Sequence, residues 1–65
     1  MANIADNVRN ARKKTGLSQD KLAREADVAY NTVVKIESGE NKNPTIETLR
    51  SIAKALGVSV DELIN

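Results

Sequence analysis

Several residue types on which protein chemistry often depends are missing from this sequence. Its 65 residues include no cysteine, histidine, phenylalanine or tryptophan, and only one tyrosine and one proline. Without cysteine or histidine there is no disulfide framework, no zinc finger, and no Cys or His nucleophile or imidazole base. The carboxylates fall at expected helix caps and exposed faces and form no plausible acid and base pair. We therefore expect neither an enzyme nor a metal or cofactor site.

Long apolar runs are missing too. The longest contain two or three residues, too few to cross a membrane, and the first ten residues lack the apolar centre of a signal peptide. We therefore expect a soluble, cytoplasmic protein. The length allows one domain, residues 1–65, near the lower limit for folding on a hydrophobic core alone.

Neither sign of charge is in large excess. The net charge of +1 argues neither for nor against a nucleic-acid partner. Residues 1–44 carry eight Lys or Arg against six Asp or Glu, and residues 45–65 carry two against three, so the mild positive excess lies in the first part. The basic run Arg12-Lys13-Lys14 fits a solvated helix C-terminus, where cations interact favourably with the helix dipole.

The stretch from Leu17 to Ile36 predicts two short helices with almost no loop between them. Ser18 can accept a bond from a free backbone N–H of the first helix, and Leu17 and Leu22 have the spacing of a hydrophobic staple. A sharp bend at Asp27 needs a left-handed backbone, which Asp tolerates better than most residues. Two helices joined in this way, over approximately 18–38, are typical of a helix-turn-helix unit that binds DNA.

The second of these helices has an apolar inward side and a mixed outward side. Val33, Ile36 and Glu37 share the inward side. The outward side presents Tyr30, Asn31, Val34, Lys35 and Ser38. Ala29, at the expected N-cap, has no side-chain oxygen, so the first amides of the helix are left to Asp27, to water or to a phosphate.

Three further helices are predicted around this pair. One begins at Asn3 and stops at Thr15-Gly16, one runs from the cap Thr45 to Gly57, and a short one follows the capping box of Ser59 and Glu62 to about Ile64. The segment after Thr45 has the most regular apolar spacing and should be central to the core; its apolar residues are Ile46, Leu49, Ile52, Ala53 and Leu56. With no strand pattern, the expected fold class is a compact all-α domain of five helices.

A longer pattern extends through nearly the whole chain. It consists of Leu17-Ser18-Gln19, Leu22-Ala23, Ala26, Val28, Thr32-Val33, Ile36-Glu37, Gly39, Pro44, Leu49, Ala53, Leu56-Gly57-Val58 and Leu63. This pattern resembles the lambdoid phage repressor and Cro helix-turn-helix family. The resemblance implies a lambda repressor-like fold and a sequence-specific transcription regulator, a repressor, that places its third helix in the major groove of an operator.

The resemblance also implies roles for single residues. Base reading would fall to Tyr30, Asn31, Val34 and Lys35. Contacts with the DNA backbone would fall to Ser18, Gln19, Thr32, Lys42 and Asn43, and Gln19 would also brace the reading helix. Asn can bond an adenine edge, Lys the acceptors of guanine, and Val can pack on a thymine methyl. Two alternatives stay open: Gln19 as an ordinary exposed polar residue, and a Tyr30 hydroxyl that reaches a phosphate instead of a base.

Two further features follow from the resemblance. Arg12 and Glu37 resemble an ion pair that ties the first helix to the third, the alternative being that both charges reach solvent. The surface that carries the dimer contact would be Val58, Ser59, Val60 and Asp61. We therefore expect a homodimer on double-stranded operator DNA, and a weak dimer or a monomer when free.

Three residues depart from the family pattern. Glu40 would repel phosphate, Thr45 stands where some members carry a basic side chain, and Asp27 replaces the usual glycine. Together with the near-neutral charge, the first two favour an alternative function, a protein–protein interaction module of the same fold, of the coactivator-bridging or antitoxin-like kind. A steep loss of binding with added salt would favour DNA.

Overall fold

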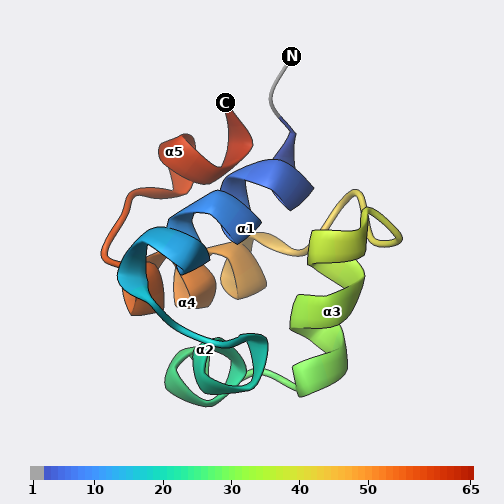
Figure 1. Ribbon diagram of the computed structural model, residues 1–65. Coiled ribbons are helices and arrows are strands. Elements are labelled where there is room, and N and C mark those ends of the chain that lie inside the picture. Colours follow the sequence, from blue (N-terminus) through green and yellow to red (C-terminus); the bar gives the residue numbers. More distant parts are fainter. Residues whose placement is uncertain (1–2) are drawn as a thin grey trace.

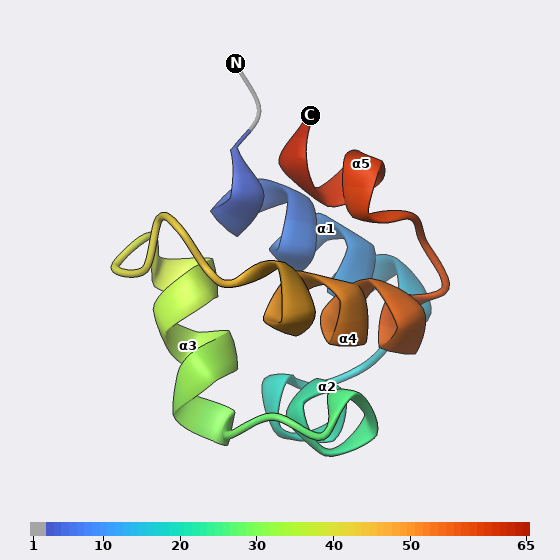
Figure 2. The same cartoon turned by 180° about the vertical axis from the view of Figure 1, so that it is seen from behind.

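The computed structural model describes residues 3–65, and this part of the chain forms five α-helices (Figure 1). The helices are α1 (Ile4–Thr15), α2 (Gln19–Ala26), α3 (Tyr30–Ser38), α4 (Ile46–Leu56) and α5 (Val60–Ile64). Figures 1 and 2 show α1 and α4 crossing in the middle, α2 below them, α3 along one side, and α5 above. The predicted all-α, five-helix fold is confirmed. Among the described residues, no helix is both long enough and apolar enough to span a bilayer.

Four of the five helices in the described part of the chain begin where the sequence offers a capping oxygen, and α3 is the exception. Ser18 Oγ accepts a bond from the Lys21 amide at 3.0 Å, and Thr45 Oγ1 accepts one from the Thr48 amide at 3.2 Å. Ser59 and Glu62 form both bonds of the predicted capping box. Each of these bonds satisfies a first-turn amide that has no partner within the helix. Local chemistry therefore fixes these helix starts.

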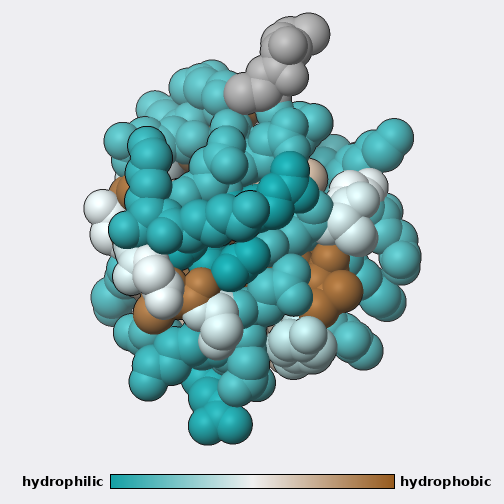
Figure 3. Space-filling view, in the orientation of Figure 1, coloured by the Kyte–Doolittle hydropathy of each residue, from teal (hydrophilic) through white to brown (hydrophobic). Residues whose placement is uncertain are grey.

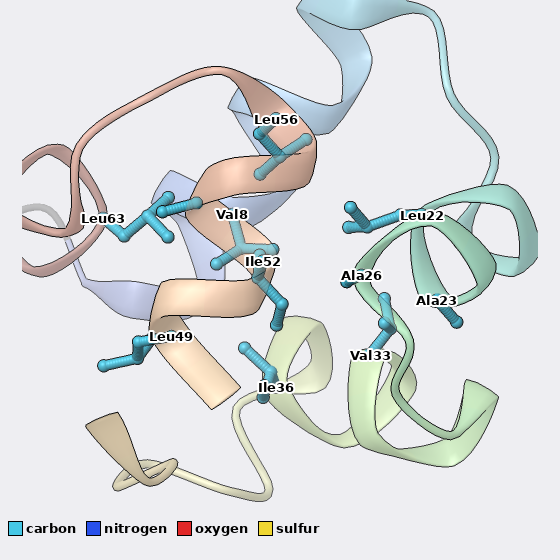
Figure 4. Packing of buried hydrophobic residues seen from close by; sticks show 11 residues of the cluster. Val8, Leu22, Ala23, Ala26, Val33, Ile36, Leu49, Ile52, Leu56 and Leu63 are labelled. Atoms are coloured by element: carbon cyan, nitrogen blue, oxygen red, sulfur yellow. The ribbon is translucent and has the colours of Figure 1, made fainter. Parts of the chain in front are cut away.

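A single apolar core joins the helices. Its eleven buried side chains come from all five helices, and Figure 4 shows Ile52 of α4 projecting towards Ile36 of α3 and Ala26 of α2. The surface in the view of Figure 3 is largely hydrophilic, with small apolar patches. One predicted core position is wrong, because Ile46 is 52% exposed. Ile46 is the first residue of α4, and a side chain there points back past the helix end, beyond its neighbours.

A side chain of α1 holds the end of α5. Asn7 Nδ2 donates to the carbonyl oxygens of Leu63, at 2.9 Å, and Asn65, at 3.0 Å. The last carbonyls of a helix have no partner within it, so this amide satisfies two of them at once. A five-residue helix with little stability of its own is thereby fastened to α1.

Candidate nucleic-acid interface

One side of α3 is buried and the opposite side is open. Val33 and Ile36 are fully buried, and Glu37 is 4% exposed. The four residues predicted to read bases lie on the other side: Tyr30 is 50% exposed, Asn31 and Lys35 are exposed, and Val34 is half-buried. Because they are spaced i, i+1, i+4 and i+5, they form one continuous face. Figure 3 shows an apolar patch over α3 among hydrophilic neighbours.

Glu37 holds this helix in place through a two-bond ion pair with α1. Arg12 Nε lies 2.7 Å from Glu37 Oε2, and Arg12 Nη2 lies 3.0 Å from Glu37 Oε1. The Glu37 side chain is 3% exposed and that of Arg12 is 14% exposed, so the alternative in which both charges reach solvent is wrong. The hydrogen bond with Glu37 raises the pKa of Arg12, although burial acts in the opposite direction.

Two further donors reach Glu37, from Gln19 and Arg9; the resemblance implied that Gln19 braces the reading helix but did not name Glu37 as its partner, and the Arg9 contact was not predicted. Gln19 Nε2, on the first residue of α2, donates to Glu37 Oε1 at 3.1 Å. Arg9 Nη1 donates to the backbone carbonyl of Glu37 at 3.2 Å. Gln19 is half-buried, so it is not simply an exposed polar residue of the first turn. The partners lie 18 and 28 positions apart, and no local spacing signals such a contact. Glu37 thus ties α1, α2 and α3 together.

The N-terminus of α3 has no side-chain cap. Ala29 occupies the cap position in an extended conformation, and no side chain within residues 3–65 accepts a bond from the first turn. The alternative in which Asp27 caps this helix is therefore wrong in this structure. Asp27 instead ends α2 in the left-handed conformation, at φ 57° and ψ 43°. Thr32 is the third residue of α3 and is half-buried. Its amide donates to the Ala29 carbonyl at 3.0 Å.

The remaining residues predicted to contact the DNA backbone lie at two places. Lys42 and Asn43 are exposed in the loop after α3. Ser18 is exposed at the start of α2, where its oxygen already accepts the bond that caps the helix. The loop is held against the end of α3, because the Asn41 amide donates to the Lys35 carbonyl at 3.0 Å. A DNA backbone that contacts α3 would therefore also meet this loop, which is bonded to the end of the helix.

The predicted dimer surface is only partly open. Val58 and Val60 are half-buried against the core, and Ser59 is engaged in the capping box. Asp61 is exposed on the first turn of α5. Figures 1 and 2 both place the connection between α4 and α5 on the side of the molecule opposite α3.

Five helices arranged in this way, with a buried ion pair between α1 and α3 and an exposed face on α3, define the class of lambda repressor-like helix-turn-helix domains. Comparison with known families leads to the same class. The family model described as helix-turn-helix matches residues 8–63. The chain belongs to this family, whose members are DNA-binding transcription regulators and not enzymes.

Curated relatives include a transcriptional repressor and several transcriptional regulators. The cryptic phage CTXphi transcriptional repressor RstR of Vibrio cholerae is 40% identical over 60 residues, which cover 92% of this chain and 53% of RstR. The regulator SinR of Bacillus licheniformis is 36% identical over 62 residues, which cover 95% of this chain and 56% of SinR. The chain therefore spans about half the length of these curated relatives.

Solved structures share the fold along nearly the whole chain. SinR, the master regulator of biofilm formation, in complex with DNA has a TM-score of 0.90 and 35% identity, with 92% of this chain and 95% of that chain covered. The P22 c2 repressor in complex with a synthetic operator has a TM-score of 0.90 and 28% identity, with 100% and 97% covered. These matches confirm the lambda repressor-like fold class.

Proposed function

We propose that this chain binds operator DNA with α3 in the major groove and acts as a transcriptional repressor. The observation that carries the proposal is the exposed face of α3, which is held from behind by the Arg12–Glu37 pair. A helix that reads bases must present its side chains in fixed positions, and side chains of two other helices, α1 and α2, bond Glu37 to hold this one. The similarity of this chain to the SinR and P22 c2 repressor structures with bound DNA supports this proposal.

In this proposal the outward face of α3 supplies sequence specificity. Asn31 bonds an adenine edge, Lys35 donates to guanine acceptors, and the exposed part of Val34 packs against a thymine methyl. Tyr30, at the start of the helix, lies where its hydroxyl reaches either a base edge or a phosphate. These four side chains specify the site.

Contacts with phosphate would position the domain. The uncapped first turn of α3 leaves backbone amides for an anion, as helix N-termini commonly do. Gln19 has two amide hydrogens, and a second remains for phosphate while the first is bonded to Glu37. Ser18, Thr32, Lys42 and Asn43 complete the proposed backbone contacts. Gln19 would then couple a phosphate directly to the group that holds the reading helix.

We also propose that residues 1–65 act as one DNA-binding domain, with the helix-turn-helix unit at about 18–38. The domain would bind as a homodimer through Val58, Ser59, Val60 and Asp61, because a domain this small makes few contacts alone. It would be a monomer or weak dimer when free. We propose the cytoplasm as its site of action.

Selection of bound sequences from a random pool of double-stranded DNA tests the proposal. An enriched motif is expected, and the absence of any motif would overturn it. On that motif, Asn31→Ala should cost about 1–3 kcal/mol and relax the preference at one base pair. Gln19→Ala should weaken binding to all sequences alike. Equal losses at every position from both variants would mean that α3 is not the reading helix.

A second candidate function is a protein-interaction module of the same fold. The net charge of +1 favours it, and so does Glu40, an exposed carboxylate in the loop that would face phosphate. Salt titration separates the two functions. Binding through several phosphates weakens steeply as salt rises, by orders of magnitude between low and moderate salt. Weak, salt-insensitive binding to every DNA tested would favour the protein partner.

A further inference from the structure

The loop after α3 brings a carboxylate to the proposed reading face. Glu40 Oε2 lies 3.9 Å from Lys35 Nζ, and the two side chains are 69% and 54% exposed. Ion pairs this exposed contribute little to folding stability, because water screens them and ordering two long side chains costs entropy. The consequence of this pair therefore lies in what else Lys35 can bind.

The position of Glu40 is built into the loop. The Lys35 carbonyl accepts bonds from Ser38 Oγ at 3.1 Å and from the Asn41 amide at 3.0 Å. The Glu40 amide in turn donates to Ser38 Oγ at 3.3 Å. Residues on both sides of Glu40, and its own amide, are thus anchored to the end of α3. The backbone of Glu40 is therefore held beside the end of α3, within reach of Lys35 for its side chain.

We propose that Glu40 is a specificity-determining residue that competes with DNA for Lys35. Every DNA sequence offers phosphates to a cation, and a carboxylate nearby weakens that attraction while it repels the phosphates itself. Guanine offers two directional acceptors, N7 and O6, only where the correct base lies opposite Lys35. Hydrogen bonds from Lys35 to these acceptors offset the loss of its ion pair with Glu40. Glu40 therefore weakens binding to unrelated DNA more than binding to the correct site. The inference rests on the proposed function.

Four proteins test this competition: the parent chain, Glu40→Gln, Lys35→Met, and the double variant. Each is titrated at fixed salt against the sequence selected from the random pool and against an unrelated duplex of equal length. Glu40→Gln should tighten binding to unrelated DNA by about two- to fivefold, the range set by one exposed ion pair. It should tighten binding to the selected site less. The ratio of specific to non-specific affinity should therefore fall, and thermal unfolding should be unchanged.

The Lys35→Met background separates competition for Lys35 from general repulsion. In this background the gain from Glu40→Gln on unrelated DNA should largely disappear. Glu25→Gln, which removes the same charge from an exposed position on α2, is the matched control and should produce a smaller gain than Glu40→Gln. An equal gain with or without Lys35, an equal gain from Glu25→Gln, or no gain would each overturn the inference.

The outcomes also distinguish this inference from the proposed function beneath it. If the random pool yields no motif, operator binding itself fails. If a motif emerges and Glu40→Gln leaves the specificity ratio unchanged, only the role of Glu40 fails, and Lys35 remains a candidate base-reading residue.

Discussion

At the scale of single residues, the decisive group is the Glu37 carboxylate. Glu37 is the only charged residue among residues 3–65 that is buried, and its carboxylate accepts bonds from Arg12 and Gln19. A carboxylate removed from water is costly unless it is paired, and Glu37 lies two residues beyond Lys35 on the proposed reading helix. The ion pair between Arg12 and Glu37 therefore links the stability of the domain to the position of its reading face.

Arg12→Ala should destabilise the protein by about 3 kcal/mol, because it leaves a buried carboxylate with Gln19 as its remaining side-chain donor. In a domain of this size the melting temperature should fall by about 12 °C or more. Thermal unfolding followed by circular dichroism measures the change. Lys13→Ala, which removes the same charge from an exposed neighbour, should leave the melting temperature nearly unchanged. Equal melting temperatures for Arg12→Ala and the parent would contradict a structural role for the pair.

The loss of stability in Arg12→Ala should not depend on pH between neutral and mildly alkaline conditions. Glu37 raises the pKa of Arg12 in the folded protein. A group with a raised folded pKa contributes its stability fully below its unfolded pKa and loses it only as pH rises through the folded value. For arginine both values lie far above neutrality. The difference in stability between the parent and Arg12→Ala should therefore be constant on the alkaline side of neutral.

The sequence predicted some of these residue-scale features and missed others. Glu37 was expected on the inward side from helical spacing, and Arg12 was expected opposite it only through the family resemblance. The resemblance also implied that Gln19 braces the reading helix, but it did not identify Glu37 as the group that Gln19 bonds, and the contact of Arg9 with Glu37 was not expected. Helical spacing tells which side a residue occupies, but it does not tell which side chain from another helix reaches that side.

At the scale of helices and turns, the connection between α2 and α3 departs most from the expected chemistry. Asp27 is the only non-glycine residue with positive φ among those described, whereas Gly16, Gly39 and Gly57 end three other helices in the same conformation. The Asp27 backbone is strained relative to glycine, and its carboxylate lies at the negative end of the α2 dipole. This connection fixes how α3 stands on α2, so its strain bears on the whole unit.

Asp27→Gly should stabilise the protein by about 0.5–1 kcal/mol, since it removes the cost of a left-handed side-chain residue. Gly57→Asp is the reciprocal control. It introduces the same cost at φ +72°, where an added Cβ meets no atom within 4 Å, so it should destabilise by a similar amount through the backbone alone. Urea unfolding measures both. A loss of stability in Asp27→Gly would show that the Asp27 side chain makes a compensating contact in solution.

Helix ends were predictable because caps are local. Ser18, Thr45 and Ser59 each needed only a serine or threonine ahead of an apolar repeat, and the structure shows each bonding the amide three residues on. Ile46 was misplaced because the same repeat does not reveal where the neighbouring helices stop. Asn7, which fastens α5, was missed since its partners are 56 and 58 positions away. Periodicity thus locates helices better than it locates the edges of a core.

At the scale of the whole molecule, the proposed reading and dimer surfaces lie on opposite sides. The molecule measures 27 × 21 × 19 Å, with α3 along one side and the start of α5 reached from the other (Figures 1 and 2). Two copies that meet through the connection between α4 and α5 would leave both α3 helices outside the dimer contact. Helix-turn-helix dimers bind half-sites one turn of DNA apart, about 34–36 Å, which requires that both reading helices stay accessible.

The dimer should therefore select a palindrome whose half-site centres lie about 10 base pairs apart. Insertion of about five base pairs between half-sites turns one of them to the opposite side of the duplex and should abolish cooperative binding of the second copy. Asp61→Arg should weaken binding to the palindrome but not to a single half-site, because Asp61 is exposed in the proposed contact. Glu25→Arg, with the same charge change on α2, is the control. Electrophoretic mobility titrations count the copies bound, and binding of the second copy that is indifferent to spacing would contradict a dimer through this surface.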